Sequence, residues 1–291
     1  MEIMPMRENR PVTGKWYIIG AALLWGLAGV CVKSVSWGPM SLIASRSLLS
    51  LIILCICLKK KKVVFSSGNI LGAVMMSLTG ILYVIAIKLT TAGTAIVLQY
   101  AAPILVFLYE IVFRHRKPTC AEILITFAVF GGIVLSFADS LDASHLLGNI
   151  LAILSAFTFA AQIIIMNRKD TDSGDSLIIS CVLSLIASVP FLFSDPGLTF
   201  DLTNIFWVCV LGIFQYGLAN VLFGIGIRRT EALESSLLLT IEPVFNPIPV
   251  ALIYGEKMGV TAVIGSVIVI VSVALYGLLP SIRKRMRHVS V

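Results

Sequence analysis

Two ionisable residues lie inside long apolar stretches of this 291-residue chain, where a charge is costly. Glu242 is about ten residues from either end of the stretch 232–253, and Arg46 is about seven residues inside the stretch 39–58. A carboxylate accepts bonds from an ammonium group, whereas a guanidinium donates to an anionic group. The two together would suit a zwitterion such as an amino acid. A structural ion pair is the alternative for each.

Pro243 directly follows Glu242 and alters the backbone around it. Proline disfavours helical geometry at the preceding residue and removes one backbone hydrogen bond, so a carbonyl group is expected to become free beside the carboxylate. Asn246 lies four residues beyond Glu242 and shares its helical face. We therefore predict that Glu242 binds the amino group of a ligand or a proton.

Further polar and aromatic residues near the middle of the apolar stretches are candidates to line a binding site. They are Trp25, Tyr83, Gln99, Tyr100, Phe159, Gln162, Tyr216 and Asn220. Amide side chains inside such helices more often bond to a neighbouring helix than to a ligand. Aromatic rings around a carboxylate favour an organic cation or an apolar amino acid, because a cation is attracted to the face of a ring.

The residue patterns argue against an enzyme. The sequence contains no HExxH, GxSxG, GxGxxG or Walker motif, and His115, His145 and His288 all lie outside the apolar stretches. The six cysteines form no CxxC pair and are expected to pack as small apolar residues. We therefore predict no cofactor and no metal site. A membrane-embedded enzyme and a scaffold remain as remote alternatives.

The composition of the chain indicates that these residues lie within a membrane. The chain is 58% hydrophobic and only 13% charged, against about 45–50% and about 25% in soluble domains. Stretches of some twenty apolar residues can cross about 30 Å of hydrocarbon as helices. The sequence predicts an all-α membrane protein with ten transmembrane helices, at 16–34, 39–58, 68–88, 92–112, 119–138, 146–166, 174–193, 203–226, 232–253 and 258–279.

The distribution of basic residues predicts the orientation. Eighteen of the 22 Lys and Arg residues fall at the same side of the ten spans, and the exceptions are Lys33, Lys88, Lys257 and the intramembrane Arg46. Basic loops stay in the cytoplasm, so residues 1–15 and the basic tail 281–291 are predicted to be cytoplasmic. We expect a multi-pass protein of the cytoplasmic membrane that does not bind nucleic acid.

The two halves of the chain resemble one another. A shift of 135 residues lays 41–45 over 176–180, and a shift of 140 lays Pro103 over Pro243. We assign the five-residue difference to the loop after the second and seventh spans. The halves, 16–138 and 146–280, each contain five spans, so the second enters the membrane with opposite polarity. Such inverted repeats support alternating access to a central site.

Several segments resemble a known family. They are Leu-Leu-Trp25-Gly26 in the first span, Glu242-Pro243-Val-Phe in the ninth, and Tyr254-Gly255-Glu256 after it. The chain is similar over roughly 16–280 to the EamA family, in the ten-helix branch of the drug/metabolite transporter superfamily. It departs at Arg116, where a Glu often follows the fourth span. The resemblance implies transport of small metabolites, often amino acids or organic cations and in many cases exported.

These observations lead to a functional prediction. We predict a secondary transporter that moves an amino acid or organic cation by alternating access, with export and proton coupling favoured. A facilitated uptake carrier for a cationic or nucleobase-like solute is the alternative. Spans one, three, four, six, eight and nine are expected to surround the cavity. The expected partners are the substrate, the lipid bilayer and protons, and we expect a monomer.

Overall fold

The computed structural model describes residues 13–60, 62–90, 92–138, 144–192, 194–254 and 259–289. All regular secondary structure in these ranges is helical. Most of the predicted N-terminal segment 1–15, together with Gly255, Glu256 and Lys257, lies outside the described residues. The same is true of the last two residues of the predicted basic tail.

The described part of the first half contains seven α-helices. They are α1 (Thr13–Trp25), α2 (Ala28–Ser34), α3 (Pro39–Leu58), α4 (Ser67–Leu89), α5 (Ala92–Gln99), α6 (Ala102–Val112) and α7 (Cys120–Ser136). The second half forms α8 (Leu146–Met166), α9 (Ser173–Leu192), α10 (Leu202–Cys209), the π-helix η2 (Val210–Leu218), α11 (Ala219–Ile227), α12 (Ala232–Leu239), α13 (Ile241–Phe245), α14 (Pro247–Tyr254) and α15 (Val260–Val289).

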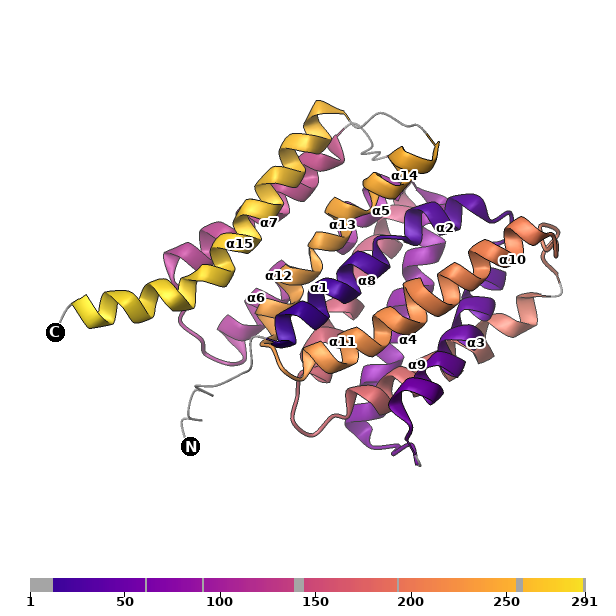
Figure 1. The fold of residues 1–291 in the computed structure, drawn as a ribbon, viewed down its shortest axis with the longest axis horizontal. Helices are drawn as coiled ribbons and strands as arrows, with labels where there is room; N and C mark the ends of the chain where they lie inside the picture. The colour runs from indigo at the N-terminus through magenta and orange to yellow at the C-terminus, as the bar shows by residue number, and fades with distance from the viewer. Residues whose placement is uncertain are drawn as a thin grey trace.

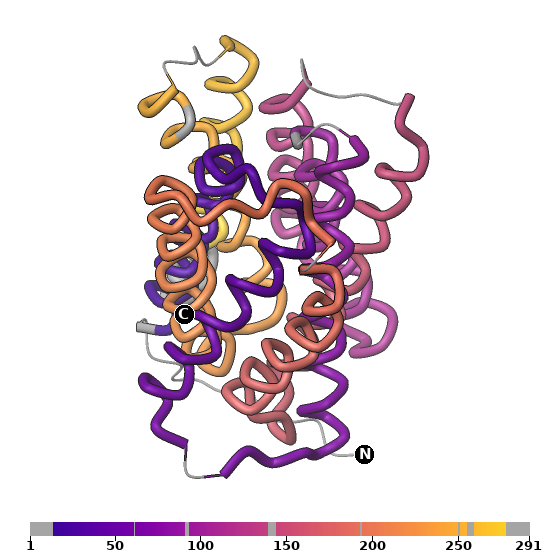
Figure 2. The backbone as a smooth tube through the Cα atoms, turned by 90° about the vertical axis from the view of Figure 1, so that its right-hand side faces the viewer, coloured from indigo at the N-terminus to yellow at the C-terminus, as the bar shows by residue number. Residues whose placement is uncertain are grey.

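These helices confirm the predicted fold class. Nine helical segments of the described chain are long and apolar enough to cross a membrane, and each coincides with one predicted span. The remaining predicted span, 119–138, is the shorter apolar helix α7, whose 17 residues extend about 26 Å at 1.5 Å each. The long helices lie roughly side by side, with their connections at the two ends (Figure 2).

Contacts between the halves follow an inverted repeat. α3 packs against its counterpart α9, and α7 packs against its counterpart α15 at one edge of the bundle (Figure 1). The packing of α4 on α8 is repeated by that of α11 on α1, and the packing of α4 on α9 is repeated by that of η2 on α3. Each interface thus has an equivalent formed by the other half. This is the arrangement expected when two five-helix units cross the membrane with opposite polarity.

The helices of several spans are interrupted near their middle. The first span breaks after Trp25, the fourth breaks before Pro103, and the ninth breaks at Thr240 and again before Pro247. The eighth span instead contains the π-helical turns of η2. Proline explains the breaks in the fourth and ninth spans, because it cannot donate the helical hydrogen bond and crowds the preceding turn.

The five-residue difference between the two repeat shifts, 135 and 140, does not arise in the loops where the sequence predicted it. The N-caps Ser66 of α4 and Asp201 of α10 are still 135 residues apart, so the loops after the second and seventh spans are not where the shift arises. The eighth span has 26 residues, whereas the third has 23. The loop after the eighth span is also two residues longer than the loop after the third span. A π-helix accommodates extra residues within a span, and η2 is the segment that does so.

A cluster at one face of the bundle joins the two halves through Asn69, near the start of α4. Its amide oxygen accepts from the Asp172 N–H at 2.8 Å, and its amide nitrogen donates to the Val64 carbonyl at 2.8 Å. Lys60 pairs with Asp172 at 2.7 Å and with Asp175 at 2.6 Å. Partial burial alone would lower the pKa of Lys60, but these bonds outweigh it and raise that pKa. We refer to Asn69, Lys60, Asp172 and Asp175 as the Asn69 cluster.

The opposite face carries an equivalent cluster on Asn204, at the matching position of α10. Its amide oxygen accepts from the Ser36 N–H at 3.1 Å, and its amide nitrogen donates to the Thr199 hydroxyl at 2.7 Å. Asp195 accepts from the Gly38 N–H at 2.7 Å. Partial burial alone would raise the pKa of Asp195, but the Ser41 side chain and the backbone N–H groups of Gly197 and Gly38 outweigh it and lower that pKa. We refer to Asn204, Ser36, Gly38, Asp195 and Thr199 as the Asn204 cluster.

Arg116, the residue at which the chain departs from the family pattern, makes a third polar cluster at the end of the fourth span. Its guanidinium pairs with Glu110 of α6 and, at 2.6 Å, with Glu122 of α7. Glu122 also completes a capping box with Thr119 at the start of α7. The two acidic residues are buried. The cluster therefore fixes the turn between the fourth and fifth spans.

The seam between α7 and α15 offers a test of the packing. A Cβ atom added at Gly132 would lie 2.9 Å from the Gly265 carbonyl oxygen, whereas one added at the adjacent Gly131 would meet nothing within 4 Å. We expect Gly132→Val to destabilise the protein by about 1–3 kcal/mol through overpacking, and Gly131→Val to leave stability near that of the wild type. Thermal unfolding followed by size-exclusion chromatography in one detergent measures both. Equal decreases in unfolding temperature in the two variants would contradict the close packing of α7 against α15 at Gly132.

Candidate functional site

A cavity of about 80 Å³ lies between the two halves, with room for several water molecules. Its walls combine charged, amide, aromatic and small side chains from both halves. The lining residues are Trp25, Arg46, Met76, Thr79, Gly80, Gln99, Phe159, Gln162, Gln215, Tyr216 and Glu242. Spans one, three, four, six, eight and nine all contribute, as the sequence predicted. The second span also contributes, through Arg46.

Glu242 lies in α13, just beyond the break in the ninth span. Its carboxylate accepts a 2.5 Å hydrogen bond from the Tyr100 hydroxyl, which also lies 3.2 Å from the Leu239 carbonyl oxygen. Leu239 is four residues before Pro243, so its carbonyl is the one that proline leaves without a helical donor. Tyr100 therefore stabilises both the broken helix and the carboxylate, while Glu242 still faces the cavity.

Arg46 reaches the same cavity from α3. Its guanidinium packs over the Tyr216 ring, 4.5 Å from the ring centroid, and donates a long 3.4 Å bond to the Gly80 carbonyl. A Cβ atom at position 80 would lie 2.8 Å from Arg46 Nη2, so only glycine lets the guanidinium approach this backbone. Arg46 and Glu242 thus share one cavity. Among the described residues no carboxylate lies within 4 Å of the Arg46 guanidinium.

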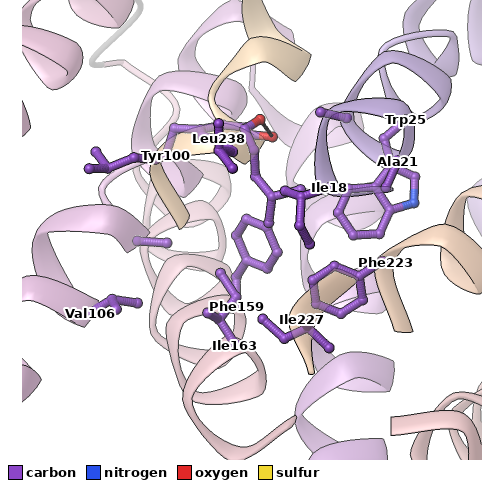
Figure 3. Close-up of a cluster of buried hydrophobic side chains, with 14 of the residues drawn as sticks. Ile18, Ala21, Trp25, Tyr100, Val106, Phe159, Ile163, Phe223, Ile227 and Leu238 are labelled. Carbon is purple, nitrogen blue, oxygen red and sulfur yellow. Dashed lines mark hydrogen bonds between the residues drawn. The ribbon is translucent and has the colours of Figure 1, made fainter. Parts of the chain in front are cut away.

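The rings of Trp25 and Phe159 form an apolar wall of the cavity, and the rings of Phe223 and Tyr100 pack behind them. The Trp25 ring centroid lies 6.4 Å from that of Phe159, in an edge-on arrangement, and 5.2 Å from that of Phe223. Tyr100 meets Phe159 edge-on at 6.1 Å. These rings converge from α1, α8, α11 and the break between α5 and α6 (Figure 3). The cavity therefore has an apolar side next to its two charged groups.

Polar atoms gather near the cavity where the first span is broken. The first span breaks after Trp25, and the Trp25 carbonyl accepts from the Gln215 amide at 3.2 Å. Gly26 permits this break to approach the ninth span, since a Cβ atom there would lie 2.7 Å from Phe245. The Trp25 Nε1, Arg46 Nε and Gln215 Oε1 atoms are buried and have no hydrogen-bond partner within the described chain. Buried polar atoms of this kind are normally satisfied by water or a ligand.

Four of the predicted site residues do not line the cavity. Tyr100 lies behind Glu242 as its hydrogen-bond donor. Tyr83 packs against the apolar core, close enough to Glu242 and Arg46 to feel the charge of each. Asn220 is completely buried in α11. Asn246 packs against Gly29, where a Cβ atom would lie 2.4 Å from its amide oxygen.

The other predicted residues are brought together, with additions that sequence reasoning missed. Trp25, Arg46 and Gln99 lie around the cavity with Phe159, Gln162, Tyr216 and Glu242. The additions are Met76, Thr79 and Gly80, and Gln215, a candidate by its position beside Tyr216, also lines the cavity. Gln215 is adjacent to Tyr216 in the sequence, and Thr79 lies one turn before Tyr83. Gly80 carries no side chain, so its role as an acceptor for Arg46 has no sequence signal.

Comparisons with known proteins agree with this architecture. A model of the EamA-like transporter family matches residues 12–138 and 146–278. A protein of Archaeoglobus fulgidus described as an uncharacterized transporter is 24% identical over 268 residues, which are 90% of this chain and 95% of that protein. A crystal structure of another protein has a TM-score of 0.79 at 16% identity and covers 92% of this chain and 97% of that chain.

The double role of Tyr100 can be tested by removing only its hydroxyl group. Tyr100→Phe leaves the Leu239 carbonyl and the Glu242 carboxyl without this donor, so we expect a loss of about 1–3 kcal/mol in the free energy of unfolding. Tyr109→Phe on α6 is the control, because its ring stacks on Phe113 and its hydroxyl makes no hydrogen bond among the described residues. Thermal unfolding measures both. Equal stability of the two variants would contradict the assignment.

Proposed function

We propose a function from one premise, which is that this chain belongs to the EamA-like transporter family. It is a multi-pass membrane transporter for a small-molecule substrate. We infer that it is a secondary carrier that moves a small organic metabolite, either an amino acid or an organic cation, across the cytoplasmic membrane. On this proposal the chain acts as a monomer with both termini in the cytoplasm, and it exports its substrate with coupling to protons.

One observation carries the proposal. A polar cavity lies between two inverted halves, at the breaks of the first, fourth and ninth spans and beside the π-helix of the eighth. Secondary carriers build substrate sites from interrupted helices near the middle of the membrane, where freed backbone groups meet the substrate. The lining of this cavity combines a carboxylate, a guanidinium and three amides with the aromatic rings of Trp25, Phe159 and Tyr216. Such a lining suits a small solute with both polar and apolar parts.

Alternating access requires that the halves separate at one face while they stay joined at the other. The Asn69 and Asn204 clusters join the halves at opposite faces through equivalent hydrogen bonds. Asn69, Asp175 and Asn204 are buried, but each cluster also contains half-buried or exposed groups, such as Lys60 in the first and Asp195 and Thr199 in the second. Water can reach these groups and replace the hydrogen bonds when the halves part. We propose that they open in turn as the halves rock around the cavity.

Glu242 is the residue that we propose binds the amino group or a proton. We expect Glu242→Gln to lower the initial rate of transport in proteoliposomes by at least about tenfold, because a charge-assisted hydrogen bond is lost. The variant should also lose any dependence of the rate on a pH gradient. Flux of labelled amino acids and amines, measured at several internal and external pH values, tests both.

The control for this variant is Glu231→Gln, at the exposed N-terminus of the same span. It removes the same charge outside the cavity, so transport should continue at close to the wild-type rate. Size-exclusion profiles establish that both variants fold. Unchanged and still pH-dependent transport in Glu242→Gln would remove this residue from the mechanism. Absence of flux of any solute in the wild type would overturn the carrier itself.

The two clusters should have opposite effects on access to the cavity. In a cysteine-free background with Thr79→Cys on the cavity wall, Asn204→Ala should increase labelling by an impermeant maleimide from the Asn204 face severalfold. Asn69→Ala should decrease it, because losing one cluster favours the state open at that face. In vesicles of reversed orientation, where the maleimide approaches from the Asn69 face, Asn69→Ala should increase labelling and Asn204→Ala should decrease it. A change in the same direction for both variants would contradict rocking of the halves.

A further inference from the structure

The Arg46 guanidinium is the one cavity-facing cation of the described chain, and it lacks an anionic partner. Within the described ranges its one hydrogen bond is the long one to the Gly80 carbonyl, and its Nε atom has no partner there. The Tyr216 ring compensates part of the charge by contact with its face. A guanidinium has five N–H donors, so most of them remain available.

No other described group takes the place of that partner. Glu242 faces the same cavity but is bonded to Tyr100 and makes no ion pair with Arg46. Gly80, which accepts a hydrogen bond from Arg46, and Tyr216, whose ring packs on it, are both neutral. Arg46 is half-buried, and an arginine held only for structure would normally be paired there, because leaving a charge without a partner costs more as it loses contact with water. The arrangement is instead that of a site whose anion arrives with the ligand.

We propose that Arg46 is a carboxylate-binding residue that determines the class of the substrate. The carboxylate of the solute meets the guanidinium, which can bind both oxygens in a fork-like geometry. Its amino group meets Glu242 across the cavity, and its side chain lies against the rings of Trp25 and Phe159. The transporter thus carries carboxylate-bearing zwitterions, and amines that lack a carboxylate are repelled by Arg46.

This inference rests on the proposed carrier function but can fail separately from it. The test uses two matched sets of ligands that differ only in their charged groups. One set is phenylalanine, 2-phenylethylamine and 3-phenylpropanoate, and the other is leucine, 3-methylbutylamine and 4-methylpentanoate. Binding is measured by the ligand-induced shift in unfolding temperature, and transport by counterflow in proteoliposomes.

In the wild type we expect at least one amino acid to bind about tenfold or more tightly than its amine. Arg46→Gln should remove that preference, and Arg46→Lys should restore part of it. Lys88→Gln is the control, because it removes an exposed cation from the neighbouring α4. Amines that bind as tightly as the amino acids, or a preference that survives in Arg46→Gln, would overturn the proposal. Binding of no carboxylate ligand in either set would do the same.

A measurement without ligand separates binding from structure. Arg46→Met removes the charge and keeps much of the side-chain volume, so the unfolding temperature of the ligand-free protein should be unchanged or higher. A drop of several degrees would mean that Arg46 is a structural residue, and the proposal would fail. Carboxylate binding that depends on Arg46, without flux of any solute, would contradict the carrier function and leave the carboxylate site in place.

Discussion

Every backbone polar group inside a bilayer must find a partner without the help of water, and this constraint organises the protein. Two helix breaks leave carbonyl groups free near the cavity, at Leu239 and at Trp25. Side chains of other spans meet both, since Tyr100 approaches the first and Gln215 donates to the second. At these two breaks a neighbouring span thus supplies a polar group to the freed carbonyl. The residues that hold the scaffold together are for this reason the neighbours of the cavity.

The two halves share the same arrangement of helices but differ in the side chains that they contribute to the cavity. Pro103 and Pro243 interrupt equivalent spans, yet Glu242 precedes only the second, and the matching position before Pro103 is Ala102. The third and eighth spans are also equivalent, but the eighth has a π-helix that presents Gln215 and Tyr216. π-Helical turns often occur at functional sites because they shift side chains out of the regular helical register. The cavity is thus asymmetric inside a symmetric frame.

The sequence predicted the spans well because their signals are local. Apolar length and the alternation of basic loops depend on neighbouring residues, and Pro103 and Pro243 mark breaks wherever they occur. The rotation of each helix about its axis is different, because it depends on packing with other spans. Asn246 shares a helical face with Glu242, and its N–H still bonds to the Glu242 carbonyl at 2.9 Å, but it lies one turn further along the span, where its side chain packs on Gly29. Gly80 could not be predicted, since its contribution is a backbone carbonyl. The offset was misplaced because a π-helix has no clear sequence pattern.

The equivalent clusters on Asn69 and Asn204 have a consequence for biogenesis. Lys60 and Asp195 are 135 residues apart and occupy the same position of the repeat, one at each face. A backbone built from inverted copies has no intrinsic preference for either direction of insertion, so side chains must provide it. Lysine favours retention in the cytoplasm, whereas aspartate has little effect on topology. Lys60 is one of the eighteen basic residues from which a single direction of insertion is predicted, and at the duplicated position Asp195 adds no competing positive charge, while the ammonium group and the carboxylate each still join the two halves at their own face.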